Sequence, residues 1–307
     1  MAQAIGAAGY GNVGIGFMDG EYMALGDLRI PVFDLGFQLS DMCYDALRVW
    51  DGRFFRQDTH MERFDRSIRE RRYNTLGYDI DQIGEVLHEC VRRSGLRRSM
   101  VTVIATRGTP TDGLKDLRTC RNRLMAWAAP YYTVITEDEV KTGCDVVVSN
   151  VVRIPPDSVD PTIKNFARLD FCRALFEAYD RGSRYALLID KEGNVTEGRG
   201  WNIFALKDGR MVSPDSGVLE GVTRRTVLEL SQRLNIKGSL GKLKPGELRS
   251  ADEVFLTSTA GGVMPVRSID GKPIGDAAPG PVTRRLSEMF WALNDDPNYS
   301  TPVRYDA

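Results

Sequence analysis

The first residue that could take part in a reaction is Lys164, which follows a proline-rich stretch. Pro155, Pro156 and Pro161 exclude a helix there, so we expect the lysine on a constrained loop just ahead of a helix. A loop lysine is usually a solvated surface residue. If the loop lines a pocket, desolvation removes the proton from the amine, and a neutral amine attacks aldehydes. The loop by itself leaves both interpretations open.

A second feature is the segment Thr196-Glu-Gly-Arg-Gly-Trp-Asn202, which lies inside a strand pattern. Two glycines in a strand mark either a bulge or a place where a ligand approaches the backbone. In the second case, Glu197 is placed to pair with a pyridinium nitrogen. Such a pair keeps the ring protonated and makes the ring an electron sink.

Two further segments offer hydroxyl and amide groups. Gly221, Val222 and Thr223 open a predicted helix, where backbone N–H groups and the threonine hydroxyl form either a phosphate cradle or a plain N-cap. The segment Thr257-Ser-Thr259-Ala-Gly-Gly262 follows a predicted strand. It is either a second phosphate grip or a turn.

Arg63 lies one helical turn after His60 and suits bidentate binding of a phosphate, although a surface ion pair is the alternative. The combined set is a nucleophilic lysine, a carboxylate for a ring nitrogen, two hydroxyl and amide clusters and an arginine for a phosphate. Few ligands other than pyridoxal phosphate (PLP) require that set.

At these residues the chain resembles the fold-type IV PLP enzymes, the branched-chain and D-amino-acid aminotransferase family, and more closely the (R)-selective amine transaminases. The likeness runs from about Phe17 to Tyr305. The motifs that carry it, in order, are Ile30-Pro-Val-Phe-Asp-Leu-Gly-Phe37, Val49-Trp-Asp-Gly-Arg-Phe-Phe-Arg56, Ser158 to Asn165, Glu197-Gly-x-Gly-x-Asn202, Gly221-Val-Thr-Arg224 and Thr259-Ala-Gly-Gly262.

The resemblance implies roles for individual residues. Lys164 corresponds to the lysine that carries PLP as a Schiff base and shuttles the proton, and Glu197 to the acid at the pyridine nitrogen. Arg63, the Val222-Thr223 turn and Thr259 correspond to the phosphate cup. The residues implied at the substrate pocket are Leu39, Tyr44 (an aromatic wall), Met100, Thr102, Arg118, Arg168 and Ala260. A homodimer with the active site between the lobes, near a loop from the other subunit, is implied as well.

The chain departs from the (R)-amine transaminases at several substrate positions. Leu39 replaces a histidine, Arg168 replaces a tryptophan, and Met100 and Thr102 replace a phenylalanine and a frequent glutamate. The mobile arginine that accepts the keto-acid carboxylate is also missing from its usual loop. We then expect either that Arg118, Lys115 or Arg168 binds the keto-acid carboxylate, or that this carboxylate is bound weakly.

The predicted reaction is therefore transamination, with ping-pong kinetics, between an amine or amino acid and a keto acid or ketone. An (R)-selective amine transaminase is the first expectation, and a D- or branched-chain amino-acid aminotransferase is the alternative. A lyase of the aminodeoxychorismate type shares the implied fold and is a third possibility. A non-catalytic binding protein would not need the lysine, the acid and the arginine together.

The elements that must position these residues indicate an α+β fold in two lobes, since strands and helices do not alternate strictly. The expected parts are a flexible arm (1–16), a small N-terminal domain (17–130), a linker (131–142) and a large PLP-binding domain (143–307). Helices are expected near 58–76, 79–94, 166–181, 222–234 and 282–293. Strands are expected near 101–105, 124–128, 145–153 and 253–257, with a hairpin over 186–207 and a polar loop over 107–123.

The composition limits the kinds of binding partner that we expect. With 41 basic and 42 acidic residues, the net charge of −1 gives no reason to expect a nucleic-acid or membrane partner. Five widely spaced cysteines indicate free thiols in a reducing cytoplasm. With only two histidines, a metal site is not expected.

Overall fold

The computed structural model describes residues 13–113, 115–276 and 278–306, and residue contacts divide the chain into two compact units. The first unit comprises Met1–Tyr132, Ile163–Ala167 and Asn294–Ala307, and the second comprises Thr133–Thr162 and Arg168–Leu293. The expected division differs at two places, because 163–167 and the C-terminal segment join the first unit. Residues 1–12 of the expected arm (1–16) lie outside the described residues, and its last two residues, Ile15 and Gly16, begin strand β1.

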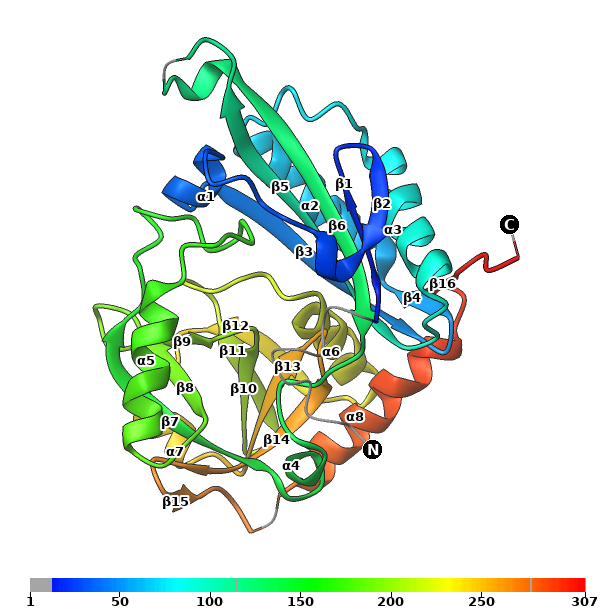
Figure 1. Ribbon diagram of the computed structural model, residues 1–307. Helices are drawn as coiled ribbons and strands as arrows, with labels where there is room; N and C mark the ends of the chain where they lie inside the picture. Colours follow the sequence, from blue (N-terminus) through cyan, green and yellow to red (C-terminus); the bar gives the residue numbers. More distant parts are fainter. Residues whose placement is uncertain (1–12, 114, 277, 307) are drawn as a thin grey trace. The chain divides into compact units, whose positions relative to one another are not determined.

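The first unit is built on an antiparallel sheet with the order β16-β4-β3-β5-β6-β1-β2 within the described residues (Figure 1). Helices α2 (Gln57–Glu70) and α3 (Ile80–Ser94) cover one face, and the short α1 (Leu35–Leu39) contacts β5. The strands are β1 (Ile15–Met18), β2 (Glu21–Ala24), β3 (Met42–Trp50), β4 (Arg53–Phe55), β5 (Ser99–Pro110), β6 (Cys120–Pro130) and β16 (Ser300–Pro302).

The alternation of apolar side chains along β3 determines which face of the sheet the helices cover. Cys43, Leu47 and Val49 are buried in one cluster with Phe64 of α2 and Leu87 of α3. Because side chains alternate across a strand, Tyr44 and Ala46 lie on the opposite face. One face of the sheet is therefore core, and the other carries the residues expected around the substrate.

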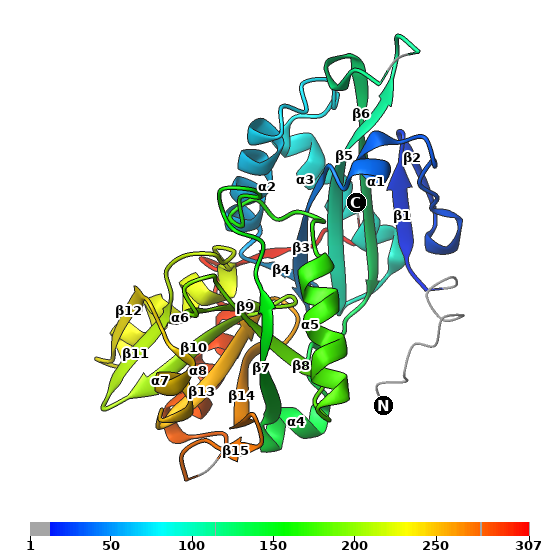
Figure 2. The same cartoon turned by 90° about the vertical axis from the view of Figure 1, so that its left-hand side faces the viewer.

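The second unit is built on a mixed sheet with the order β12-β11-β10-β13-β14-β7-β8-β9, to which β15 adds beside β14. Helix α5 packs on β7 and β8 through Phe171, Ala174 and Ala178 (Figure 2). The strands are β7 (Cys144–Val152), β8 (Tyr185–Ile189), β9 (Val195–Gly198), β10 (Asn202–Lys207), β11 (Arg210–Pro214), β12 (Lys237–Gly241), β13 (Glu253–Ser258), β14 (Gly262–Ile269) and β15 (Lys272–Pro273). The helices are α4 (Glu137–Thr142), α5 (Leu169–Asp180), α6 (Val222–Arg233), α7 (Pro245–Arg249) and α8 (Pro281–Ala292).

The predicted α+β class is confirmed, and α3, α5, α6 and α8 lie close to the predicted helices. Two expectations were wrong in extent. Helix α2 ends at Glu70 rather than near residue 76, because Thr75 instead makes tertiary hydrogen bonds to Asn122 and to the carbonyl of Cys120. The two ends of the expected polar loop 107–123, residues 107–110 and 120–123, are strand, since a bulge around Gly108 lets β5 and β6 continue their pairing.

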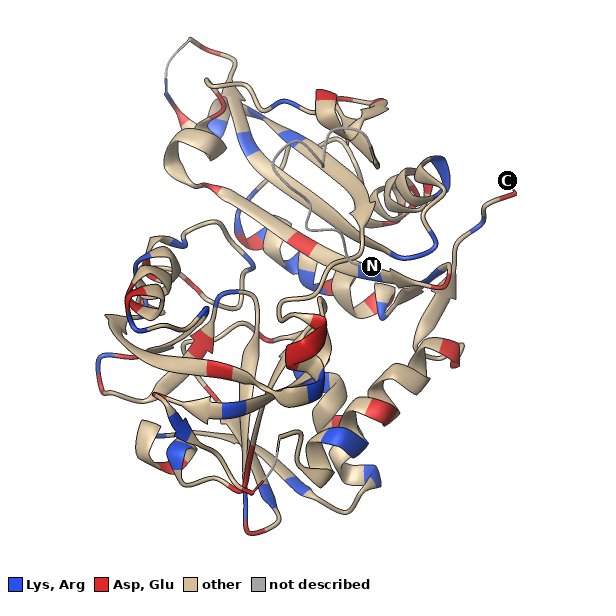
Figure 3. Ribbon diagram, turned by 60° about the horizontal axis from the view of Figure 1, so that its bottom comes forward, with Lys and Arg blue, Asp and Glu red and all other residues tan. Residues whose placement is uncertain are grey.

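Basic and acidic residues are interspersed along the ribbon of each unit (Figure 3). None of the described helices is long and apolar enough to cross a membrane. All five cysteines are free thiols, as predicted. The described residues contain no cluster of histidine, cysteine and carboxylate side chains that could hold a metal ion.

Candidate active site

Lys164 is fixed in the first unit by backbone pairing with β3. The N–H of Tyr44 donates to the carbonyl of Lys164 at 2.9 Å, and Cys43 and Asn165 form an antiparallel bridge. The Asn165 side chain accepts from the N–H of Ala167 at 2.9 Å. The proline-rich segment therefore ends in a short stretch whose backbone pairs with β3 in the manner of an edge strand.

The side chain of Lys164 lies against an aromatic ring. Its Nζ is 4.6 Å from the ring centroid of Tyr44, and the Phe166 ring is 4.9 Å from Tyr44 on centroids. This contact gives the lysine an apolar wall and restricts the directions that its amine can take. Lys164 and Tyr44, which is expected as an aromatic wall of the substrate pocket, are thus in contact within one unit.

Two more expected pocket residues share the face of Tyr44. In the register of β3 with β5, Ala46 lies opposite Thr102 and Arg48 lies opposite Met100. Thr102 is half-buried and Met100 is buried. Leu39 lies at the end of α1 and is 59% exposed.

The arginines near the expected carboxylate site are already paired. Arg118 lies on the loop between β5 and β6, its side chain is 89% exposed, and its Nη2 is 2.6 Å from Asp116 Oδ2. Arg107 donates to Asp41 Oδ2 at 2.6 Å and to the carbonyl of Arg71 at 2.7 Å. In the second unit, Arg168 is half-buried at the N-cap of α5.

A buried charged cluster surrounds Asp45 on the helix-covered face of β3. Arg63 donates through Nε to Asp45 Oδ2 and through Nη2 to Asp45 Oδ1, both at 2.8 Å. Nδ1 of His60 is 2.7 Å from the same Oδ1. Burial opposes ionisation of Asp45, but the Arg63 guanidinium and the hydrogen bonds from Arg63 and His60 hold the pKa of Asp45 well below its usual range, while burial lowers the pKa of His60. The cluster is therefore an aspartate with an arginine and a neutral histidine.

In the second unit, Glu197 is the next-to-last residue of β9 and a buried carboxylate with three donors. It accepts from the N–H of Leu219 at 2.9 Å and from Asn202 Nδ2 at 3.3 Å. Arg153 Nη2 is 3.4 Å away, while Arg153 Nη1 donates to Asp170 at 2.6 Å. Donors and a nearby guanidinium stabilise the ionised form, so the carboxylate can receive a cationic ring N–H.

Two glycines next to Glu197 are needed for space. A Cβ at Gly198 would overlap the Trp201 indole, and a Cβ at Gly221 would overlap Oδ1 of Asn202. A side chain at either position would displace residues that support the carboxylate. The bulge and ligand interpretations of this segment are therefore compatible. The backbone is closely packed at Gly198 and Gly221, and this close packing surrounds Glu197.

Helix α6 begins without a side-chain cap. Gly221 is its N-cap residue and donates no capping group, no acid lies in the first turn, and Val222 and Thr223 are buried. Arg224 is also buried, which lowers its pKa, and it donates to the carbonyl of Pro214 at 2.7 Å. The positive end of the helix dipole is thus left for an anion.

The turn after β13 brings further hydroxyl groups to this sheet. Thr257 pairs in register with Asn202, and its buried Oγ1 has no hydrogen-bond partner in the structure. Thr259 is half-buried in the turn that follows, and Ala260 is buried there, with its carbonyl accepting from the N–H of Val134. A buried hydroxyl without a partner is costly, so its presence points to a ligand or water.

The family follows from comparison with known proteins. Residues 42–269 match the family model described as amino-transferase class IV. The chain belongs to this family. A putative branched-chain-amino-acid aminotransferase of Methanocaldococcus jannaschii is 30% identical over 89% of this chain and 94% of its own length. The branched-chain-amino-acid aminotransferase of Escherichia coli K12 is 27% identical over 90% of this chain and 92% of its own length.

Solved structures of class IV aminotransferases agree. The T.th. branched-chain amino acid aminotransferase with pyridoxamine 5'-phosphate superposes with a TM-score of 0.88, at 27% identity over 95% of this chain and 99% of that one. The enzyme of Thermoproteus uzoniensis with norvaline gives a TM-score of 0.85 at 26% identity, covering 94% and 99%. The chain is therefore a PLP-dependent transaminase of fold type IV, as the resemblance implied.

The residues of this aminotransferase fit the cofactor. A phosphate dianion suits the uncapped start of α6 and a partnerless Thr257 hydroxyl, and a protonated pyridine suits the ionised Glu197.

Sequence reasoning missed Asp45, Arg153 and Asp170. Asp45 had a usable signal, because it is the one acid among the inward-facing apolar residues of its strand and such an acid needs a partner. Arg153 and Asp170 gave no signal, since an arginine before prolines and an aspartate at a helix start are ordinary surface residues.

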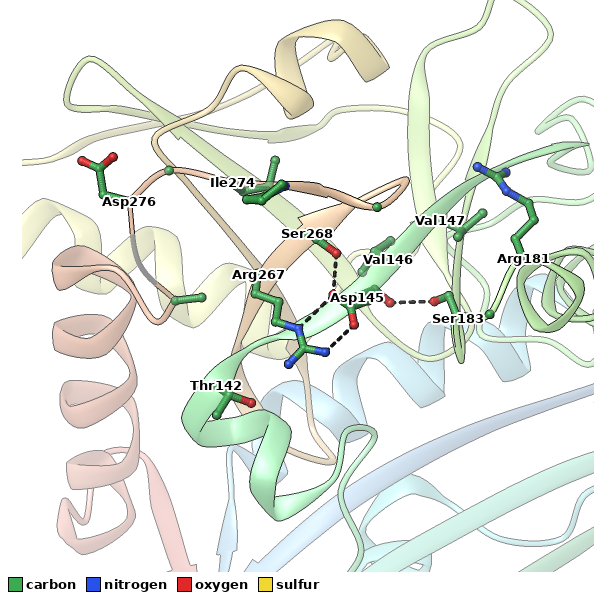
Figure 4. Close-up of a pocket in the computed structure, with 15 residues that line it drawn as sticks. Thr142, Asp145, Val146, Val147, Arg181, Ser183, Arg267, Ser268, Ile274 and Asp276 are labelled. Atoms are coloured by element: carbon green, nitrogen blue, oxygen red, sulfur yellow. Dashed lines mark hydrogen bonds and ion pairs between the residues drawn. The ribbon is translucent and has the colours of Figure 1, made fainter.

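A cavity of about 530 Å³ lies elsewhere in the second unit (Figure 4). Arg267 and Ser268 both donate to Asp145 in its wall, and Arg181 of the same wall is paired with Asp270. None of the predicted site residues lines it. Arg267 and Arg181 of its wall are each held in an ion pair, with Asp145 and Asp270 respectively.

Proposed function

We propose that this aminotransferase acts on aliphatic α-amino acids and 2-oxo acids, as a branched-chain-type enzyme. The observation that carries the proposal is the similarity to enzymes named for branched-chain amino acids along about nine-tenths of the chain, at 27–30% identity. This ranks the branched-chain alternative above the (R)-selective amine transaminase. The chain's departures at Leu39, Met100, Thr102 and Arg168 agree with that order, because they are departures from the amine transaminases.

We also propose the division of labour among its residues. Lys164 binds PLP covalently and, once released, moves a proton to and from the reacting carbon, a role worth about 10²–10⁴-fold in rate. Bound PLP supplies the electron sink. Glu197 keeps the ring nitrogen protonated, and Arg63, the Val222-Thr223 turn and Thr259 hold the phosphate. Tyr44, Met100, Thr102 and Ala260 shape the substrate pocket.

One observation favours a second candidate, the (R)-selective amine transaminase. An amino acid needs a partner for its carboxylate, whereas an amine does not. Arg118 is exposed and paired with Asp116, and Arg107 is paired with Asp41. Both would have to break an existing ion pair before they could bind a carboxylate.

A donor and acceptor screen tests the proposal. The purified holoenzyme is mixed with L- and D-leucine, L- and D-valine and both hands of a simple arylalkylamine, and conversion of PLP to the pyridoxamine form is followed by absorbance. A branched-chain-type enzyme should convert with the L-amino acids and revert with a 2-oxo acid. Conversion with the (R)-amine alone would establish the second candidate, and pyruvate release without conversion would indicate elimination.

We also propose that the protein forms a homodimer and that it is located in the cytoplasm. Leu169, Phe176 and Tyr179 form an outward apolar stripe on α5 and are 78%, 69% and 50% exposed. In the first unit, Val32, Phe33 and Phe37 are 63%, 73% and 52% exposed near α1. Soluble monomers rarely leave such apolar patches open, and a second copy of the chain is the partner that we propose for them. The free thiols fit a reducing compartment.

A further inference from the structure

We propose that Asp45 is a positioning residue for the cofactor: through Arg63, it sets how tightly the protein holds the phosphate of PLP. The proposal rests on the proposed function, in which Arg63 is one of the phosphate ligands. Asp45 itself touches Arg63, His60 and its own strand, and its role is to fix the direction of the arginine.

The geometry of the pair carries the argument. Asp45 is 0% exposed, and its two oxygens accept from Nε and Nη2 of Arg63 at 2.8 Å each. A guanidinium carries five N–H donors in one rigid plane. The carboxylate that takes the Nε–Nη2 edge therefore also fixes the plane of the group and the direction of its Nη1 edge.

Two further donors lock the carboxylate. Nδ1 of His60 lies 2.7 Å from Oδ1, and the N–H of Ala46 donates to the same oxygen at 2.8 Å. His60 is 1% exposed, and a neutral ring at this distance places its proton on Nδ1. Asp45 is thus held by β3 and α2 together, and it cannot follow Arg63 if the arginine moves.

This rigidity matters for affinity, because a ligand group that is already oriented loses less freedom on binding. Two effects oppose each other when Asp45 is neutralised. The arginine loses its fixed direction, which weakens phosphate binding, but its charge is less compensated, which strengthens the attraction. We expect orientation to dominate, since bidentate recognition of a phosphate depends on the plane of the guanidinium.

Binding of two cofactor forms to the apoprotein separates these effects. The apoprotein is titrated with PLP and with pyridoxal, which lacks the phosphate, and binding is followed by quenching of the fluorescence of its four tryptophans. The measured quantity is the ratio of the two dissociation constants. Removing the hydrogen-bond partner of a metal-binding residue typically costs about 10–100-fold in metal affinity. By analogy, we expect Asp45→Asn to weaken PLP binding about tenfold and leave pyridoxal binding unchanged.

Asp34→Asn is the matched control. Asp34 is also a 0% exposed aspartate of the first unit, but it accepts from Gly36, Thr106 and Gly108 rather than from Arg63. Its removal should lower thermal stability without changing the PLP-to-pyridoxal ratio. If Asp45→Asn does not fold, Asp45→Glu keeps the charge but moves the carboxylate, and its ratio should fall between those of the native protein and Arg63→Ala.

The outcomes distinguish this inference from the function on which it rests. An Arg63→Ala variant with a native ratio would show that Arg63 does not bind the phosphate, and the proposed role of Arg63 would fail. A changed ratio in Arg63→Ala together with a native ratio in the Asp45 variant would overturn the inference alone. Tighter PLP binding by Asp45→Asn would also overturn it, because charge and not orientation would then decide affinity.

Discussion

Tyr44 and Lys164 are joined twice: the backbone N–H of Tyr44 donates to the carbonyl of Lys164 at 2.9 Å, and the lysine Nζ lies 4.6 Å from the tyrosine ring. The strand that carries Tyr44 also carries Asp45, which points to the other face and holds Arg63. A single strand therefore carries both the aromatic wall of the reactive amine and the carboxylate that holds a proposed phosphate ligand.

Replacing Lys164 should abolish turnover. We expect Lys164→Ala to lower the transamination rate by at least about 10²–10⁴-fold, because both covalent attachment and proton transfer depend on its amine. Borohydride reduction followed by peptide mapping should find no PLP attached to the variant. Lys115→Ala, on the exposed loop after β5, is the control and should retain trapping on Lys164. Trapping on another lysine in the variant would show that the assignment is wrong.

Replacing Glu197 should lower the rate much more than PLP affinity. Loss of the partner for a developing or fixed charge commonly costs about 10²–10³-fold in kcat, and we expect a loss of that size for Glu197→Gln. Its control is Glu253→Gln, since both carboxylates are 6% exposed but Glu253 accepts from the N–H groups of Val282 and Thr283 at the start of α8. The control should lose stability and keep kcat. Equal kcat losses in both variants would argue for a structural role only.

Stability should decline in mild acid because of the two histidines. Burial lowers the pKa of both His60 and His88. Below the ordinary value of about 6.5, the unfolded chain binds protons before the folded chain does, so the free energy of unfolding falls by up to about 1.4 kcal/mol per pH unit for each histidine. Urea unfolding of the native protein and of His60→Gln, at pH about 8 and about 5.5, measures the share of His60. The same slope in both proteins would contradict the assignment.

A charge on α5 should break the proposed homodimer. Phe176 is 69% exposed on the apolar stripe, and a buried aspartate at that position would be unpaired in an interface. We expect Phe176→Asp to convert a dimer to a monomer in sedimentation velocity, with the helical signal unchanged. Lys191→Glu, on an exposed turn of the second unit, should stay dimeric. A native protein that sediments as a monomer would reject the dimer proposal.

The sequence by itself determined the ligand chemistry and the approximate elements. Prolines before Lys164, paired glycines beside Glu197 and a glycine-led start of α6 are local signals, because backbone restrictions act within a few residues. Together with Arg63 and Thr259, these features indicate PLP without any knowledge of tertiary contacts, and the resemblance to the fold-type IV enzymes adds the expectation of transamination. The approximate bounds of α3 and α6 followed from apolar spacing along the chain for the same reason.

Only the tertiary structure decided which residues support those groups. The pairs Asp45 with Arg63, Arg153 with Asp170, and Tyr44 with Lys164 join residues that lie far apart along the chain. Their partners are set by strand register and by helix packing, and both depend on the whole sheet rather than on neighbouring residues. The same holds for 163–167 and the C-terminal strand β16, which join the first unit through pairing that no local pattern specifies.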